Sequence, residues 1–168
     1  MLSYVQIKFL WFLRMRRRIK IYLDTSVYNR PFDDQSQSRI RLEAEAFLSI
    51  LEKTIAGAVS VISSSVLVYE NSLSPFPERK ERVSHYVALA SRSVKMSDAI
   101  KKRATILEDS GFDSLDAMHL ACAESGGAEY FITCDDTIIR KSRKERNAVS
   151  LSVCSPLEFL VEEVFKNA

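Results

Sequence analysis

The chain has 168 residues, of which 46% are hydrophobic and 27% are charged. This length and composition suit one globular domain with a sizeable core and exclude a disordered chain. The formal net charge of +2 produces no strong overall field, so any surface for nucleic acid has to come from local clusters. The cysteines, Cys122, Cys134 and Cys154, form no C-x-x-C pair. This spacing indicates neither a disulfide framework nor a zinc site, and it favours a reducing cytoplasm.

Residues 1–18 combine an apolar stretch with a basic run, and we interpret them as an extension outside the fold. A secretory signal carries its positive charge ahead of the apolar region, and here the order is reversed. The apolar part is shorter than the roughly 20 residues that span a bilayer, so no membrane span is expected; a surface anchor is the alternative. Met15 directly precedes the basic run and the first predicted strand, and we hypothesise that it is the true start.

Strand patterns alternate with helix patterns along the rest of the chain. Apolar residues at helical spacing, capping residues and terminal glycines or prolines set most of the boundaries. In chain order the predicted elements are a strand at 19–23, a helix at 38–57, a strand at 58–63, helices at 64–73, 77–92, 97–111 and 113–127, an apolar run at 130–133, a helix at 137–146, a strand at 148–155 and a helix at 156–165.

This alternation predicts βαβ units and a mostly parallel sheet that helices cover on both faces. The sequence contains no internal repeat, low-complexity tract or linker. We therefore expect one three-layer α/β/α domain over residues 19–166.

Acidic residues follow two of the predicted strands. Asp24 ends the apolar run "IYL", and Asp135 and Asp136 follow "YFIT". Parallel strands bring their carboxyl ends to one edge of the sheet, and Glu70 and Asp116 in nearby helices could point toward the same edge. Converging carboxylates repel one another unless a cation compensates them. Oxygen ligands favour Mg²⁺ or Mn²⁺ over zinc, and such a site suits phosphodiester hydrolysis.

Each acid also has a simpler interpretation. Asp24 could be a turn or cap residue, and Glu70 could be a solvated helix residue. Asp116 lies three residues after Asp113, a spacing that resembles a capping box. The two acids after "YFIT" could cap the following helix. His119 could touch the site, but a packed histidine is the favoured interpretation.

The order of these acids resembles that of the PIN domain family, the nuclease domain of many prokaryotic ribonuclease toxins of the VapC type. The matching stretches are "IYLDTSVYNRPFDD", "SSVLVYENS", "DSLDAMHLACAESGGAEYFITCDD" and "VSLSVCSPLEFL". The resemblance implies a Mg²⁺- or Mn²⁺-dependent endoribonuclease, the toxin of a toxin–antitoxin pair.

The resemblance also implies roles for particular residues. Its metal-binding and catalytic acids fall, in chain order, on Asp24, Glu70, Asp116 and Asp135. Its hydroxyl residues beside the metal site fall on Thr25 or Ser26 and on Thr133. Two further acids stay open, because Asp136 could replace Asp135 as the fourth ligand and Asp113 could join through water.

RNA needs cationic contacts to its phosphates. A basic run leaves the acidic edge on the helix at 137–146, and its first cations, Arg140, Lys141, Arg143 and Lys144, are candidates for RNA binding. The alternative for this run is a solvated helix face. A cognate antitoxin and a homodimer are expected from the resemblance alone.

Other functions remain as alternatives to the toxin. One is a PIN-domain ribonuclease without an antitoxin, and another is a non-catalytic scaffold that binds RNA or protein. A receiver-like phosphoacceptor domain would use the same acidic edge, but it needs a lysine after a late strand, for which the helical Lys141 is a poor candidate.

Overall fold

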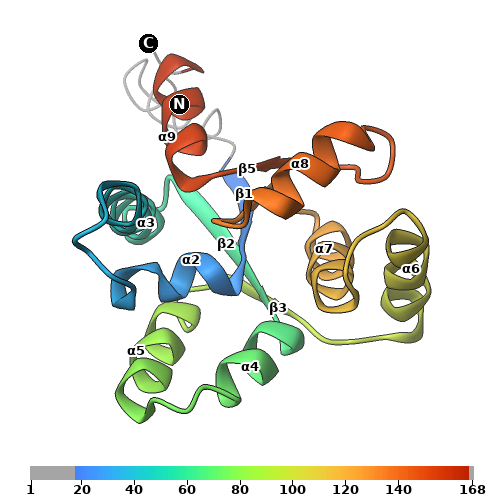
Figure 1. The fold of residues 1–168 in the computed structure, drawn as a ribbon, viewed down its shortest axis with the longest axis horizontal. Helices are drawn as coiled ribbons and strands as arrows, with labels where there is room; N and C mark the ends of the chain where they lie inside the picture. The colour runs from blue at the N-terminus through green and yellow to red at the C-terminus, as the bar shows by residue number, and fades with distance from the viewer. Residues whose placement is uncertain (1–17, 167–168) are drawn as a thin grey trace, which may run out of the picture.

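A five-stranded parallel sheet in the order β3-β2-β1-β4-β5 organises the chain (Figure 1). The computed structural model describes residues 18–166, so nearly all of the predicted N-terminal extension lies outside the described residues. The strands are β1 (Ile19–Leu23), β2 (Val59–Ser64), β3 (Arg92–Val94), β4 (Tyr130–Ile132) and β5 (Ser152–Cys154). Every pairing between them is parallel, as the alternation of elements predicts.

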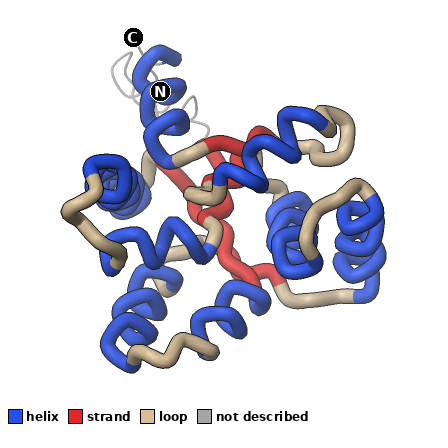
Figure 2. The backbone as a smooth tube through the Cα atoms, in the orientation of Figure 1, coloured by secondary structure: helices blue, strands red, loops and turns tan. Residues whose placement is uncertain are grey.

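Helices cover both faces of this sheet (Figure 2). They are α2 (Thr25–Asn29), the 3₁₀ helix η1 (Arg30–Phe32), α3 (Ser38–Ile55), α4 (Ser65–Ser72), α5 (Pro77–Val87), α6 (Asp98–Asp109), α7 (Ser114–Gly126), α8 (Asp136–Lys144) and α9 (Pro156–Lys166). Across residues 18–166, no helix has both the length and the apolar character needed to cross a bilayer.

Two hydrophobic cores, one on each face of the sheet, hold the layers together. Ile21 and Leu23 of β1 pack into one core with Phe47 of α3 and Phe159 of α9. Tyr22, between them, enters the other core with residues of α6 and α7. Successive side chains of a strand point to opposite faces, so a strand between two helical layers must be apolar throughout. The three-layer α/β/α prediction is confirmed.

One local prediction is wrong, and one short helix was not predicted. The helix predicted over 77–92 ends at Val87, and residues 92–94 form β3 beside β2. The backbone N–H of Ser91 donates to the Val61 carbonyl at 2.9 Å, so pairing with the sheet overrides a locally helical composition. The five residues of α2, directly after β1, were not predicted as a helix.

The register of β1 and β4 prepares the acidic edge. Leu23 is paired with Ile132, and the N–H of Asp24 donates to the Ile132 carbonyl at 2.9 Å. The residues that follow the two strands, Asp24 and Thr133, therefore lie side by side. The carboxyl ends of β1 and β4 lead into α2 and α8, and that of β2 leads into α4.

Gly126 marks a close approach between α7 and the sheet. A Cβ placed there would lie 2.7 Å from Cγ2 of Ile62 and 3.0 Å from Cγ2 of Val94. Gly126→Ala should lower the free energy of unfolding by about 1–2 kcal/mol, because overpacking outweighs the gain in helix propensity. Urea unfolding measures this difference. Ser125→Ala, at the exposed neighbouring position, is the control and should change it little.

Candidate functional site

The acids singled out by the resemblance line one cavity of about 310 Å³. Asp24 comes from the end of β1, Glu70 from α4, Asp116 from α7, and Asp135 from the start of α8. The remaining lining residues are Thr25, Ser26, Asn29, Leu115, His119 and Ile138. Segments more than 100 residues apart in the sequence therefore meet at the carboxyl edge of the sheet, as expected for an open parallel sheet.

Hydroxyl and amide donors hold the carboxylate of Asp24 in place. Oδ2 accepts from Ser26 Oγ at 2.6 Å and from Thr133 Oγ1 at 2.8 Å. Oδ1 accepts from the Thr25 N–H at 2.8 Å, so Asp24 also caps α2. The cap interpretation and the cavity interpretation therefore hold together. Asp24 is only 7% exposed, so these donors take the place of water around its carboxylate.

Glu70 is held by a different set of donors. Its Oε2 lies 2.8 Å from Nε2 of His119 and also accepts a short hydrogen bond from the Thr25 hydroxyl. Burial of the Glu70 carboxyl disfavours its ionised form, but the hydrogen bonds from His119 and Thr25 outweigh burial and lower its pKa. Glu70 is therefore not an ordinary solvated helix residue.

A chain of buried hydrogen bonds continues from Glu70 into the core. Nδ1 of His119 lies 2.7 Å from the Tyr22 hydroxyl, which lies 2.6 Å from Oγ of Ser64. A carboxylate only accepts, so Nε2 of His119 carries the proton toward Glu70, and in the neutral ring Nδ1 accepts from Tyr22. Burial raises the pKa of Tyr22 well above its usual value, which keeps that hydroxyl protonated.

His119 is thus packed and also bonded to the site. It is 1% exposed, as the favoured interpretation requires, yet it orients Glu70. Tyr22 and Ser64 were not predicted as parts of this network. For His119 there was a signal in the sequence, because the spacing of three residues from Asp116 places both on one face of a helix.

Asp116 is the acid without a compensating partner. Within residues 18–166 its half-buried carboxylate makes no hydrogen bond or ion pair, and the capping-box interpretation is not supported. Burial and then the negative charges of Asp24, Asp135 and Asp113 raise its pKa to about 6. The cavity therefore holds excess negative charge that its own residues do not neutralise.

The two open acids lie in different surroundings. Asp136 makes a two-pronged ion pair with Arg39 at 2.6 and 2.7 Å and does not line the cavity. Asp113 has an 80% exposed side chain, lies 3.4 Å from Nζ of Lys141, and is also outside the cavity lining. Asp135 lines the cavity and accepts from the Thr137 N–H at 2.7 Å, which caps α8. Geometry therefore favours Asp135 over Asp136 as the fourth acid.

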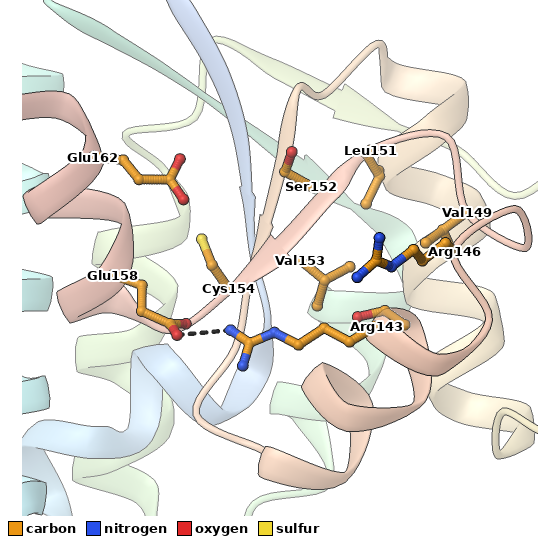
Figure 3. A pocket seen from close by; sticks show the side chains of 10 residues that line it. Arg143, Arg146, Val149, Leu151, Ser152, Val153, Cys154, Glu158 and Glu162 are labelled. Carbon is orange, nitrogen blue, oxygen red and sulfur yellow. Dashed lines mark hydrogen bonds and ion pairs between the residues drawn. The ribbon is translucent and has the colours of Figure 1, made fainter. Parts of the chain in front are cut away.

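The basic run on α8 is partly engaged with acids. Lys141 pairs with Asp113, and Arg143 pairs with Glu158 at 2.7 Å. Figure 3 shows Arg143 and Arg146 at a second hollow, of about 440 Å³, beside β5 and α9. Nε of Arg140 donates to the Asp136 carbonyl, and Lys144 is exposed. The role of the run in RNA binding stays a prediction.

The donor chemistry of the cavity fits a hard divalent cation. In the described part of the chain, no three His, Cys, Asp or Glu side chains form a ready-made ligand cluster. The acids surround the cavity and supply only carboxylate oxygens, the ligand type of Mg²⁺ and Mn²⁺. Burial and the neighbouring carboxylates raise the pKa of Asp116, so a cation bound there would favour its ionised form.

A comparison with protein families shows which family this chain belongs to. The family model described as PIN domain matches residues 21–144, most of the chain. The chain belongs to the PIN domain family. The matched residues include every acid that lines the cavity, and they end within α8.

A solved structure shares the fold of this chain. A chain in the crystal structure of VapBC2 from Rickettsia felis, bound to a DNA fragment from their promoter, aligns with a TM-score of 0.55 at 15% identity. The alignment covers 82% of this chain and 98% of that chain. A sequence search among curated proteins found no significant match.

The raised pKa of Asp116 predicts a stability change. A carboxyl whose pKa is higher in the folded state destabilises the fold as it ionises, so this cost is small at pH 4 and nearly complete above about pH 6. Without metal at pH 7.5, Asp116→Asn should raise Tm by about 2–4 °C, equivalent to about 1 kcal/mol after allowance for solvent screening. Calorimetry at both pH values tests this. Asp113→Asn is the control, and an equal rise there would contradict the explanation.

The tyrosines offer a matched test of the hydrogen-bond chain. Tyr22→Phe leaves His119 Nδ1 and Ser64 Oγ without their shared partner and should lower the free energy of unfolding by about 1–3 kcal/mol. Tyr28→Phe removes a buried hydroxyl that has no hydrogen-bond partner among residues 18–166, so it should be neutral or stabilising. Urea unfolding compares them, and equal losses in both variants would refute a structural role for the chain.

Proposed function

We propose that this protein is a divalent-metal-dependent endoribonuclease that hydrolyses RNA phosphodiester bonds. The observation that carries the proposal is the cavity lined by Asp24, Glu70, Asp116 and Asp135, with Asp116 uncompensated. Membership of the PIN domain family, a family of nucleases, supports the same conclusion.

These acids would hold Mg²⁺ or Mn²⁺. The bound ion would supply activation of a water and neutralisation of the charge that develops on the scissile phosphate. Ser26 and Thr133 fix the Asp24 carboxylate, and His119 and Thr25 fix that of Glu70. These carboxylates are therefore oriented before substrate arrives, and reorganisation costs less.

Asp116 and Asp135 complete the site in different ways. Asp116 has a pKa of about 6, so at lower pH it must release a proton before it can bind a cation. Asp135 lines the cavity and is exposed to solvent at the start of α8. Leu115 and Ile138 contribute the apolar part of the cavity lining.

We further propose that the protein is the toxin of a toxin–antitoxin pair and acts as a homodimer in the cytoplasm. Similarity of fold to a chain of the VapBC2 complex supports an antitoxin partner. Expression without a partner should inhibit growth, and co-expression of a small protein encoded beside the gene should restore it. Absence of both effects would leave a PIN-domain ribonuclease without an antitoxin.

Cleavage of a labelled mixed RNA tests the enzyme directly. We expect cleavage with Mg²⁺ or Mn²⁺, none with EDTA, and a loss of more than about a hundredfold in Asp24→Asn, because a direct ligand matters more than the supporting residues whose loss costs 10–100-fold. Product ends are resolved on a denaturing gel. Cleavage that persists in EDTA would contradict the metal-dependent mechanism.

The adjacent acids at the start of α8 provide an internal control. Asp135→Asn should abolish cleavage, and Asp136→Asn should retain it, because Asp136 faces Arg39 outside the cavity. The reverse result would overturn the assignment of the fourth acid.

A further inference from the structure

A guanidinium group lies between two aromatic rings on the surface formed by η1 and α5. Cζ of Arg79 is 5.4 Å from the ring centroid of Phe32 and 5.1 Å from that of Phe76. Its Nη2 also donates to the Phe32 carbonyl at 3.0 Å, which fixes the planar group between the rings. Together with Glu78 and Arg82, these residues line a hollow of about 320 Å³. We call Phe32, Phe76 and Arg79 the stacking cluster.

The outer ring of this cluster is open to solvent. Phe76 is 57% exposed, whereas Phe32 and Arg79 are partly buried. The hydrogen bond to the Phe32 carbonyl already holds the Arg79 guanidinium in place. An aromatic ring at Phe76 is therefore not needed to position Arg79. The cluster thus presents one fixed aromatic ring to solvent, with the cations Arg79 and Arg82 beside it.

The cluster lies on chain segments that follow two of the helices lining the acidic cavity. Phe32 follows Asn29, a cavity residue, by three positions, and Phe76 follows α4, which carries Glu70. The helices α2, α4 and α5 pack against one another, and Figure 1 shows them grouped on one side of the sheet edge, with α8 on another. A strand that leaves the cavity over α2 would therefore reach the cluster.

We propose that the stacking cluster is a subsite for single-stranded RNA, in which an unpaired base stacks on Phe76 while Arg79 and Arg82 face the adjoining phosphates. This inference rests on the proposed function. Unpaired bases are recognised by stacking on aromatic and arginine planes, and every base offers such a face. Within the hollow two arginines oppose one glutamate, which suits a polyanion. On α8, by contrast, Lys141 and Arg143 are paired with acids.

Substitutions at Phe76 test the subsite with little risk to the fold, because the side chain is mostly exposed. Phe76→Ala should raise KM for RNA cleavage about tenfold with kcat unchanged, the pattern for a contact made equally in ground and transition states. Phe76→Tyr should behave like the unsubstituted protein, and Phe76→Leu like Phe76→Ala. Leu73→Ala removes an equally exposed apolar side chain outside the hollow and is the control.

Binding separates failure of the subsite from failure of the proposed enzyme. A single-stranded RNA carrying 2-aminopurine is titrated into the single variant Asp24→Asn and into the double variant that also carries Phe76→Ala. Only the single variant should strongly quench the 2-aminopurine fluorescence. Active protein with unchanged KM in Phe76→Ala would overturn the subsite and leave the enzyme standing. If no RNA is cleaved in any metal, equal binding by the two variants overturns the subsite as well. If Phe76→Leu keeps the KM of the unsubstituted protein, the surface is a protein-docking surface instead. The same conclusion follows if the Phe76 variants lose binding to a protein but keep binding to RNA.

Discussion

The repulsion among carboxylates at the edge of a parallel sheet is the constraint on which the rest of this structure depends. The register that pairs Leu23 with Ile132 fixes where β1 and β4 end, and so places Asp24 beside Thr133. Helices from two other connections then bring Glu70 and Asp116 to the same cavity. Isolated charges of one sign are costly in such a place, so the surrounding residues must either stabilise each anion or leave it for a cation.

The hydrogen-bond donors at this edge are distributed unevenly among the acids. Asp24 receives hydroxyl and amide donors, and Glu70 receives a histidine whose other nitrogen is bonded to a buried tyrosine. These contacts define the orientation of both carboxylates, since a fully satisfied buried network has few alternative arrangements. Asp116 is left without such donors, and its pKa rises to about 6. The uncompensated charge is thus concentrated at one residue, next to carboxylates that are already oriented.

The cations on the two sides of the cavity also differ in their partners. On the α8 side Lys141 and Arg143 are paired with Asp113 and Glu158, which lowers the availability of these two cations to phosphate. On the α5 side Arg79 is bound between aromatic rings, which leaves its charge uncancelled. Cation–aromatic contacts retain the field of a guanidinium, whereas a carboxylate partner neutralises it. Charge count along the sequence therefore does not identify the face that a polyanion meets.

The sequence by itself determined the layers of this protein and the acidic character of one edge of its sheet. Apolar runs that stop at acids predicted a parallel sheet with a carboxylate edge, because only a strand buried on both faces is apolar throughout. It could not give β3, whose residues become a strand only through pairing with β2. Nor could it choose between Asp135 and Asp136, because neighbouring residues of one type differ only in what the fold places opposite each. Tertiary structure places Asp135 at the cavity and Asp136 against Arg39, and it joins Tyr22 and His119, 97 positions apart, into one network.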